Sequence, residues 1–324
     1  MTLKLGVVGA TGEVGRTMLK VLKEMNVGFD ELHLFASRRS AGKKLSFGNM
    51  ELVVRELTEE AMKEGFDYLL FSAGASVSRH FAPVAASVGT TVVDNSSAFR
   101  MDPEIPLVVP EINGDILKGY RGIIANPNCS TIQMVLSLYT IHREFGISKI
   151  VVTTFQSVSG AGRKGINELM AQIDGQEETI HFPKKIHLNV IPLIGEIKEG
   201  FSTEEWKMIN ETRKILNDPS IEVFPTTVRV PVIYGHSESI YVETRKPFEN
   251  EENLKKVLQK AEDVVVKDEI ITPLEVAGSD LVCISRLRVV KSNAFMFWNV
   301  ADNVRVGAAT NAVRILKMHM EMKG

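Results

Sequence analysis

The N-terminal third of the chain alternates short apolar runs with amphipathic stretches. Leu3–Val8 is a continuous apolar run of strand length, and the segment from about Glu13 to Met25 repeats apolar residues at helical spacing. Further expected elements are the strands Leu32–Phe35, Asp67–Phe71, Thr90–Asp94, Leu107–Pro110 and Gly122–Ala125 and a helix near Ser78–Val88. Strands that alternate with helices predict an α/β fold with a Rossmann-like, doubly wound parallel sheet.

Beyond Cys129 the expected strands become longer and fewer helices separate them. The expected strands are Lys149–Val158, Ile186–Ile194, Ile221–Val232, Ser239–Arg245 and Leu281–Val290, and the expected helices lie near Gly165–Ile173, Thr203–Leu216 and Glu251–Val264. This pattern favours a mixed sheet and therefore a second, α+β domain. The final segment, Gly307–Met322, has one apolar face and is expected to form a helix that returns to the first domain.

The length of 324 residues also favours two domains, since it exceeds the usual size of a single core. We expect one domain to comprise residues 1–128 together with 303–324, and the other to comprise residues 129–302.

The composition is that of an ordinary globular protein, with 44% hydrophobic and 24% charged residues. Thirty-eight basic and 40 acidic residues give a net charge of −2, so no nucleic-acid or anionic-membrane partner is expected. Two cysteines form no disulfide framework, which favours a reducing compartment. Residues 1–4 lead directly into a strand, and no apolar run is long enough to span a membrane. The expected location is the cytoplasm, and no metal is expected.

A glycine-rich loop follows the first expected strand and opens the first helix. Gly9–Gly15 has the pattern G-x-x-G-x-x-G, a variant of a dinucleotide-binding turn, although a merely tight turn is the alternative. The second strand ends in Ser37–Gly42, which contains two arginines and no carboxylate. Guanidinium groups suit a ribose 2′-phosphate, so this segment indicates NADP, unless the arginines are plain surface charge.

Cys129 lies between an apolar strand and an apolar helical stretch that runs onward from Ile132. Pro127 is expected to end the strand, and Ser130 or Thr131 to cap the helix. A helix N-terminus favours the thiolate, which is the nucleophilic form of cysteine, although a buried small hydrophobic residue is an equal alternative. Cys283 lies within an expected strand and is interpreted as structural.

Several other polar residues follow strands, where binding sites are commonly built. His236 lies in a loop after the strand that carries Arg229, Gln156 precedes a glycine-rich loop, and Arg100 follows a strand in the first domain. Histidine can act as an acid or base near neutral pH. A structural histidine, an exposed glutamine and a surface charge remain the alternatives for these positions taken singly.

Taken together, the order and spacing of these segments resemble the aspartate-semialdehyde dehydrogenase family over nearly the whole chain. The matching segments are Gly9–Gly15, Ser37–Gly42, Ser96–Arg100, Asn126–Thr131, Gln156–Gly162, Glu204–Lys207, Arg229–Ser237 and the pair Asp302–Asn303. The family reduces β-aspartyl phosphate with NADPH to aspartate semialdehyde and inorganic phosphate, on the route to lysine, methionine, threonine and diaminopimelate. The resemblance implies an NADP-binding first domain, a catalytic and dimerisation second domain, and a homodimer.

The resemblance also implies roles for individual residues. Cys129 would be the nucleophile that forms an acyl thioester, and His236 the acid/base. Gln156 would position the substrate, Arg229 would hold its carboxylate, and Glu204 its amino group. The phosphate would meet Arg100, Asn128 and Lys207. The residues implied to line the NADP site are Gly9, Thr11, Gly12, Glu13, Val14, Ser37, Arg39, Ser40, Ser159, Gly160 and Asn303.

Three other functions fit the sequence less well. N-acetyl-glutamyl-phosphate reductase favours Gly-Cys-Tyr at the nucleophile, whereas this chain has Asn128-Cys129-Ser130. Glyceraldehyde-phosphate dehydrogenase carries Ser-Cys-Thr-Thr and an acidic residue that reads NAD, and both are missing here. A non-catalytic NADP-binding regulator would be favoured if the thiol, imidazole, glutamine and arginine were lost, and all four are present.

Overall fold

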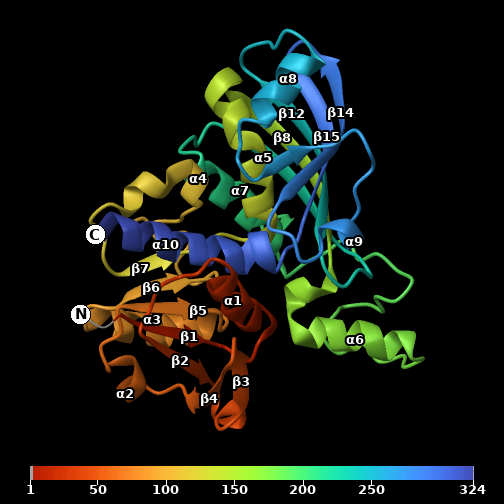
Figure 1. Ribbon diagram of the computed structural model, residues 1–324. Coiled ribbons are helices and arrows are strands. Elements are labelled where there is room, and N and C mark those ends of the chain that lie inside the picture. Colours follow the sequence, from red (N-terminus) through yellow and green to blue (C-terminus); the bar gives the residue numbers. More distant parts are fainter. Residues whose placement is uncertain (1–2, 324) are drawn as a thin grey trace. The chain divides into compact units, whose positions relative to one another are not determined.

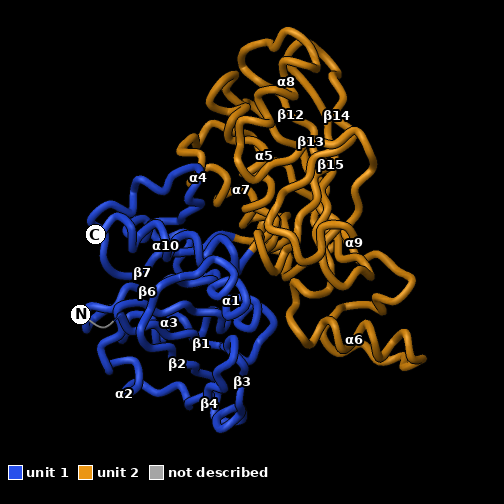
Figure 2. Tube along the Cα trace, viewed as in Figure 1, with its two compact units in different colours: residues 1–127, 308–324 blue, residues 128–307 orange. Residues whose placement is uncertain are grey.

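A computed structural model describes residues 3–323, which fall into two compact units (Figure 2). The first unit comprises residues 1–127 and 308–324, and the second comprises residues 128–307. The boundaries expected from the sequence lay after residues 128 and 302. The expected first domain includes residues 1, 2 and 324, which lie outside the described residues.

The first unit is built on a seven-stranded sheet in the order β3-β4-β2-β1-β5-β6-β7 (Figure 1). Its strands are β1 (Lys4–Val8), β2 (Glu31–Ala36), β3 (Lys44–Phe47), β4 (Met50–Glu56), β5 (Tyr68–Phe71), β6 (Thr91–Asp94) and β7 (Ile123–Ala125). All neighbouring pairs are parallel except the β3–β4 hairpin. The chain leaves β1 toward β2 on one side and later adds β5 on the other, so the loop after β1 lies at the switch point where such folds bind ligands.

Helices cover both faces of this sheet (Figure 1). The unit contains α1 (Glu13–Glu24), α2 (Glu59–Met62), α3 (Ala75–Ser87), α4 (Pro110–Asn113) and α10 (Asn311–Lys323). Buried side chains of α1 and α10 pack with Leu5 and Val7 of β1, whereas those of α2 and α3 pack in a second cluster that contains Val8. Adjacent strand residues point to opposite faces, so β1 contributes to both cores.

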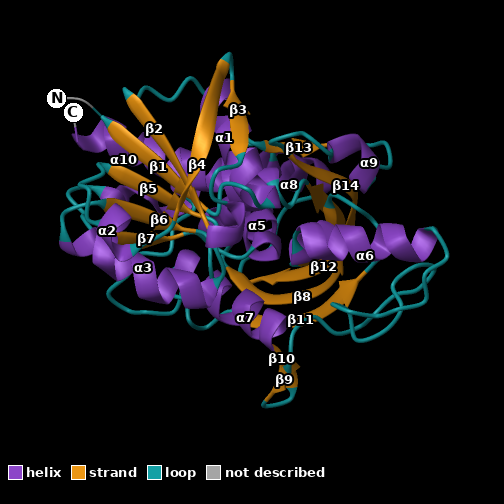
Figure 3. Cartoon of the chain, turned by 90° about the horizontal axis from the view of Figure 1, so that it is seen from below, coloured by secondary structure: helices purple, strands orange, loops and turns teal. Residues whose placement is uncertain are grey.

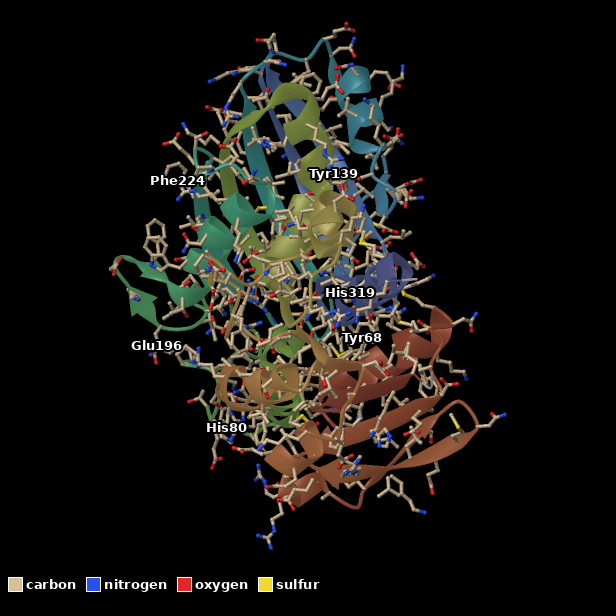
Figure 4. The ribbon with its side chains drawn as sticks, turned by 90° about the vertical axis from the view of Figure 1, so that its left-hand side faces the viewer. Tyr68, His80, Tyr139, Glu196, Phe224 and His319 are labelled. Atoms are coloured by element: carbon tan, nitrogen blue, oxygen red, sulfur yellow. The ribbon has the colours of Figure 1, made fainter. Side chains whose placement is uncertain are left out.

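The C-terminal helix α10 belongs to the first unit, as expected. Tyr68 Oη lies 2.9 Å from Nδ1 of His319, and the two side chains are adjacent in Figure 4. Nε2 of His319 lies 2.8 Å from the carbonyl oxygen of Tyr120. These contacts fix the end of the chain to residues from its first 127 positions.

The second unit contains a six-stranded mixed sheet in the order β11-β8-β12-β15-β14-β13 (Figure 3). Its strands are β8 (Ile147–Gln156), β11 (Glu222–Arg229), β12 (His236–Thr244), β13 (Val264–Val266), β14 (Val282–Lys291) and β15 (Ala294–Ala301), and a separate hairpin pairs β9 (Ile197–Lys198) with β10 (Phe201–Ser202). Its helices are α5 (Cys129–Phe145), α6 (Arg163–Ile173), α7 (Thr203–Ile215), α8 (Glu251–Leu258) and α9 (Pro273–Val276). The expected fold class, a parallel sheet with a second mixed-sheet domain, is confirmed.

Helix α5 covers one face of the mixed sheet, and most of its side chains are buried. His236, Glu238 and Ile240 alternate along β12 and are buried, whereas Ser239 and Tyr241 on the opposite face are partly exposed. The two faces of the sheet therefore differ, with the catalytic candidates on the buried side. A short 3₁₀ turn, Val158–Ala161, follows β8, and a π-helical segment, Arg305–Thr310, precedes α10.

Three expected elements are wrong in part. Ile186–Ile194 forms no strand: only Ile191 bridges to Arg229, and Leu188 adopts φ +56°, which interrupts an extended chain. In Leu107–Pro110, Leu107 makes an isolated bridge to Ala125, and Pro110 instead begins α4, because proline suits the first helical position. The helix expected at Glu251–Val264 ends at Leu258 and is followed by the β-branched strand β13.

Candidate active site

Cys129 is the first residue of α5, and Asn128 is the cap of that helix. Oδ1 of Asn128 accepts hydrogen bonds from the backbone N–H groups of Ser130 (3.1 Å) and Thr131 (3.3 Å). The expectation that Ser130 or Thr131 caps the helix is therefore wrong, since both lie inside it. The helix begins two residues earlier than it would with Ser130 as its cap. Cys129 therefore lies at the N-terminus of α5, the positive end of the helix dipole.

The capping residue is also tied to a buried carboxylate on α7. Nδ2 of Asn128 donates to Oε1 of Glu204 at 2.9 Å, and Nζ of Lys207 donates to Oε2 of the same carboxylate at 2.9 Å. Burial alone would raise the pKa of Glu204, but the Lys207 ammonium, the hydrogen bonds from Lys207 and Asn128, and the charge of Arg229 lower it to about 2. Glu204 is therefore ionised, and its hydrogen bonds bring Asn128 and Lys207, two other predicted site residues, together.

A second α7 carboxylate, missed by the sequence analysis, supports the same turn. Oε2 of Glu211 accepts a hydrogen bond from the backbone N–H of Asn128 at 2.6 Å, and Glu211 is buried. The signal was present in the sequence, because Glu204, Lys207 and Glu211 follow one another at spacings of three and four. Such spacing places charged side chains on one helix face.

Arg229 and His236 are joined through the backbone of Ser157. Nη1 of Arg229 donates to the carbonyl oxygen of Ser157 at 2.6 Å, and the N–H of Ser157 donates to Nδ1 of His236 at 3.0 Å. Both predicted side chains are buried. Burial lowers the pKa of Arg229, whereas the charges of Glu204 and Cys129 raise it, which places the cysteine sulfur within electrostatic reach of the guanidinium.

His236 is uncharged at neutral pH. Burial and the charge of Arg229 lower the pKa of its imidazole to about 3, although Glu204 and a hydrogen bond at Gly235 act in the opposite direction. Its Nε2 atom is buried and has no hydrogen-bond partner among the residues that the structure describes. A buried, unsatisfied ring nitrogen is rare in proteins and marks a position where a ligand can bind.

Two glycines allow close approach to the candidate catalytic side chains. A Cβ on Gly160 would lie 2.9 Å from Nη1 of Arg229 and 3.3 Å from Nε2 of His236. A Cβ on Gly307 would lie 3.0 Å from Cβ of Cys129. The predicted residue Gly160 thus lies beside the unsatisfied imidazole nitrogen, whereas Gly307, which the sequence analysis did not select, borders the cysteine.

The other second-unit candidates are placed around the same histidine. Oδ1 of Asn303 accepts hydrogen bonds from Gly235 N–H (3.0 Å), Ser157 Oγ (3.0 Å) and Ser159 Oγ (3.1 Å). Asn303 and Ser159, both predicted to bind the cofactor, therefore also bind one another beside His236. Gln156 is buried at the end of β8, and its Nε2 donates to Oγ1 of Thr154 at 3.3 Å.

In the first unit, the glycine loop connects β1 to α1. Gly9 adopts φ +79°, and a Cβ there would lie 2.4 Å from the carbonyl oxygen of Ser72. A Cβ on Gly15 would lie 2.3 Å from the carbonyl oxygen of Gly9, and Gly12, the cap of α1, offers no side chain to the first helical amides. This loop fits a phosphate-bearing dinucleotide, because only glycine permits the close packing and the helix amides lack a capping side chain.

The loop residues Thr11, Glu13 and Val14 are partly exposed, and so is Ser40 at the end of the 3₁₀ turn Arg38–Ser40. Ser37 and Arg39 in the adjoining segment are exposed. The structure thus presents an arginine-containing turn at the end of β2 that carries no carboxylate.

Arg100, expected to bind phosphate, makes backbone contacts within the first unit. Its Nε donates to the carbonyl oxygen of Asn126 at 2.8 Å, and its Nη2 donates to that of Asn95 at 3.0 Å. Arg100 therefore supports the segment that leads toward Cys129.

Within residues 3–323 no helix combines the length and apolar character needed to cross a bilayer. No grouping of His, Cys, Asp and Glu among these residues could hold a metal ion. Cys283 lies on β14, and burial raises the pKa of its thiol, so it is not a second thiolate candidate.

Comparison with known families first gives the class of protein. The profile described as "Semialdehyde dehydrogenase, NAD binding domain" matches residues 4–120, and the one described as "Semialdehyde dehydrogenase, dimerisation domain" matches residues 138–306. The protein is therefore a semialdehyde dehydrogenase with a nicotinamide-dinucleotide-binding domain and a domain of the dimerisation type.

Comparison with individual proteins identifies the family within this class. The aspartate-semialdehyde dehydrogenase of Aquifex aeolicus is 48% identical over 98% of each chain. The crystal structure of aspartate semialdehyde dehydrogenase II from Vibrio cholerae, complexed with ASA, is 44% identical, covers 99% of each chain and has a TM-score of 0.95. The Candida albicans enzyme, solved with NADP, is 25% identical with a TM-score of 0.79, covering 100% of this chain and 99% of that one. The chain belongs to the aspartate-semialdehyde dehydrogenase family and is an oxidoreductase.

Proposed function

We propose that this enzyme reduces β-aspartyl phosphate to aspartate semialdehyde and inorganic phosphate through a thioester on Cys129. The observation that carries the proposal is the placement of Cys129 at the first position of α5, with the Asn128–Glu204–Lys207 cluster and the Arg229–Ser157–His236 chain in the same unit. The reaction belongs to amino-acid biosynthesis.

In the first step the Cys129 thiolate attacks the acyl carbon of the substrate. The carbon–sulfur bond forms, and the bond from carbon to the phosphate oxygen breaks, with its electron pair leaving on the phosphate. Lys207 supplies a partly exposed cation and Asn128 an amide for the departing phosphate, and we retain Arg100 as a phosphate contact. The resulting thioester accepts a hydride more readily than a carboxylate does.

The charged side chains Arg229 and Glu204, near the Cys129 sulfur, would orient the substrate. The Arg229 guanidinium can bind the substrate carboxylate through two parallel hydrogen bonds, and the ionised Glu204 can bind its amino group. Gln156 positions the acyl portion, and His236 serves as the acid/base through Nε2. Each of these side chains is buried, which strengthens its electrostatic contribution relative to water.

We assign the cofactor as NADP, held on the first unit by the Gly9–Gly15 loop and by the turn that contains Arg39. When bound, the reduced cofactor supplies the hydride. The absence of a carboxylate at the end of β2 and the presence of two arginines support a 2′-phosphate contact.

We further propose a homodimer formed through the exposed face of the mixed sheet. Figure 4 labels Phe224 on β11. Phe224 is 45% exposed, and Val151 on the neighbouring strand β8 is 41% exposed. On the same face the rings of Phe155 and Trp298 lie 5.4 Å apart between centroids and remain partly exposed. An aromatic sheet face of this kind suits a second copy of the chain. We place the dimer in the reducing cytoplasm, since Cys129 and Cys283 form no disulfide.

A spectrophotometric assay tests the function. Aspartate semialdehyde should reduce NADP only when phosphate is present, and N-acetyl-glutamate semialdehyde and glyceraldehyde 3-phosphate should react at least about 100-fold more slowly. Faster turnover of either rival aldehyde would assign the chain to that activity instead. NADP binding without turnover of any aldehyde would support the regulator.

A further inference from the structure

A buried carboxyl that takes no part in the proposed chemistry lies two residues after His236. Glu238 is fully buried on β12, on the same face of the sheet as His236. Its cross-strand neighbours on this face are Asn299 of β15 and Thr154 of β8. Helix α5 covers this face, so the carboxyl lies between the strand of the histidine and the helix that begins with Cys129.

Backbone carbonyl oxygens set the orientation of two amide side chains beside Glu238. Nε2 of Gln133 donates to the carbonyl oxygen of His236 at 3.3 Å, and Nδ2 of Asn299 donates to the carbonyl oxygen of Gln133 at 3.2 Å. A carbonyl oxygen can only accept, so each amide must present its nitrogen there and its oxygen elsewhere. Nδ2 of Asn299 also donates to Oε2 of Glu238 at 2.9 Å.

This cluster of Gln133, Glu238 and Asn299 contains more acceptors than donors. Three buried oxygens have no hydrogen-bond partner among the residues that the structure describes: Oε1 of Gln133, Oε1 of Glu238 and Oδ1 of Asn299. The hydroxyl of Ser137 accepts from Asn299 at 3.4 Å and donates to the carbonyl oxygen of Met134 at 2.8 Å, so its hydrogen is already used. An ionised carboxylate would add a charge and no hydrogen, whereas a protonated carboxyl adds one donor.

Electrostatics favour the same protonation state. Burial raises the pKa of Glu238 well above its usual value, and the amides of Gln133 and Asn299 oppose this shift only in part. Within residues 3–323 no charged side chain contributes to the shift. The polar side chains around the carboxyl on α5, β8 and β15 are amides and hydroxyls. The next titratable group on this face of β12 is His236, whose pKa of about 3 leaves it uncharged.

We propose that Glu238 is a positioning residue whose neutral carboxyl supplies the hydrogen that this cluster lacks. The completed cluster holds the backbone of His236 against the helix that begins with Cys129, since Gln133 binds the carbonyl oxygen of the histidine. This inference rests on the proposed function and deepens it, and it keeps His236 as the acid/base. Loss of the carboxyl proton would leave a buried charge without a counterion, and a displacement of about 1 Å between reacting groups can lower turnover about 10²-fold.

Infrared difference spectroscopy tests the protonation state directly. The difference between the wild type and E238Q should show the carbonyl stretch of a protonated carboxyl at pH 7, and this band should disappear at the alkaline pH where Glu238 ionises. E243Q, at a partly exposed glutamate of the same strand, is the control and should leave the band in place. A spectrum at pH 7 without a protonated carboxyl that depends on Glu238 would overturn the proposal.

A pair of variants tests the positioning role. A glutamine offers a donor and an acceptor as a neutral carboxyl does, so E238Q should keep kcat at pH 7 within about twofold. Wild-type kcat should fall over the pH range in which the infrared band is lost, and kcat of E238Q should not. Leucine has a similar shape but offers neither group, so E238L should lower kcat about 10-fold or more while KM for aspartate semialdehyde changes less than about twofold.

A wild-type kcat in E238L would reject the positioning role and leave Glu238 with a role in stability alone. If E238L does not fold, the comparison with E238Q decides: equal kcat in E238Q and the wild type at a pH where the band is lost would reject the role as well. Failure of the proposed function is seen separately, as retained turnover in C129A or faster turnover of a rival aldehyde, and leaves the infrared band unaffected.

Discussion

Nε2 of Gln133 donates a hydrogen bond to the backbone carbonyl oxygen of His236 at 3.3 Å. Gln133 lies one helical turn after Cys129 on α5, so this bond joins the helix of the proposed nucleophile to β12, the strand that begins with His236. Nδ2 of Asn299 donates to the carbonyl oxygen of Gln133 (3.2 Å) and to Oε2 of Glu238 (2.9 Å). A buried polar network thus fixes β12 against α5.

Replacing Glu238 with glutamine should change how stability depends on pH. Burial raises the pKa of Glu238 well above its usual value, although hydrogen bonds from Gln133 and Asn299 oppose this. A carboxyl with a raised folded pKa contributes stability that is complete below its unfolded pKa of about 4.3 and is lost as the pH rises through the folded value. Glu238→Gln should therefore raise the urea midpoint at pH 8 and change it little at pH 4.

The matched control is Glu243→Gln on the same strand. A hydrogen bond from Tyr241 lowers the pKa of Glu243, whose side chain is partly exposed, so this variant should not gain stability at pH 8. If both variants shift the midpoint in the same direction, burial of Glu238 is not the cause.

Cys129→Ala should reduce turnover to the assay background while NADP binding, followed by fluorescence titration, changes less than about twofold. The reason is that the thiolate forms the covalent intermediate and the cofactor loop belongs to the first unit. Cys283→Ala removes the other thiol and should retain most activity. Appreciable turnover by Cys129→Ala would exclude covalent catalysis at this residue.

Arg39→Glu should weaken NADP binding by at least about 10-fold and NAD binding much less, because it places a carboxylate where the 2′-phosphate is proposed to bind. Arg38→Glu makes the same charge change at the adjacent exposed arginine. Dissociation constants of NAD and NADP, measured for each variant, show whether Arg39 discriminates between the two cofactors. Equal weakening of NAD and NADP in Arg39→Glu would make Arg39 a general surface charge.

Arg229→Lys should lower kcat/KM for aspartate semialdehyde by about 10²-fold or more, because lysine keeps the charge but loses the bidentate geometry. Arg245→Lys, at an exposed arginine of the same unit, is the control and should behave like the wild type. Arg100→Ala should instead raise the KM for phosphate. Steady-state kinetics that vary aspartate semialdehyde and phosphate in turn will distinguish the two variants. If Arg100→Ala impairs use of the aldehyde and spares phosphate, the two anion sites are exchanged.

Phe224→Glu or Trp298→Glu should shift the protein toward monomer in light scattering coupled to size exclusion, since a buried carboxylate opposes apolar association. Met50→Glu, at an exposed apolar residue of the first unit, is the control. A dimer of unchanged stability in both sheet variants would contradict the proposed interface.

The sequence predicted the parts of the fold in which one pattern is dominant. The buried runs at β1, β5 and β6 and the amphipathic segment at α1 have a single interpretation, and the structure agrees. The edge strand β3 and its neighbour β4 were missed, because both are largely exposed and their apolar residues alternate weakly. Strand β15 was missed as well, although it pairs with both β12 and β14.

Cys129, His236 and Arg229 could be chosen as site candidates from the sequence because each residue type has few chemical roles, and their catalytic roles stay predictions. The supporting groups could not, because Ser157 acts through its backbone, which has no residue-specific signature. The cap of α5 was misplaced for a related reason: Asn128 and Ser130 are both good capping residues, and only the hydrogen bonds distinguish them.

The first unit is made from both ends of the chain, and this has a consequence for synthesis on the ribosome. Ala309, Val313 and Leu316 complete the same buried cluster as Leu5 and Val7, and Gly307 lies against Cys129. A nascent chain must therefore be synthesised past Leu316 before the core of the first unit is closed, and past Gly307 before Cys129 has its final surroundings. Cys129, the proposed nucleophile, therefore acquires these surroundings long after it has itself been synthesised, so the proposed activity depends on segments that lie far apart along the chain.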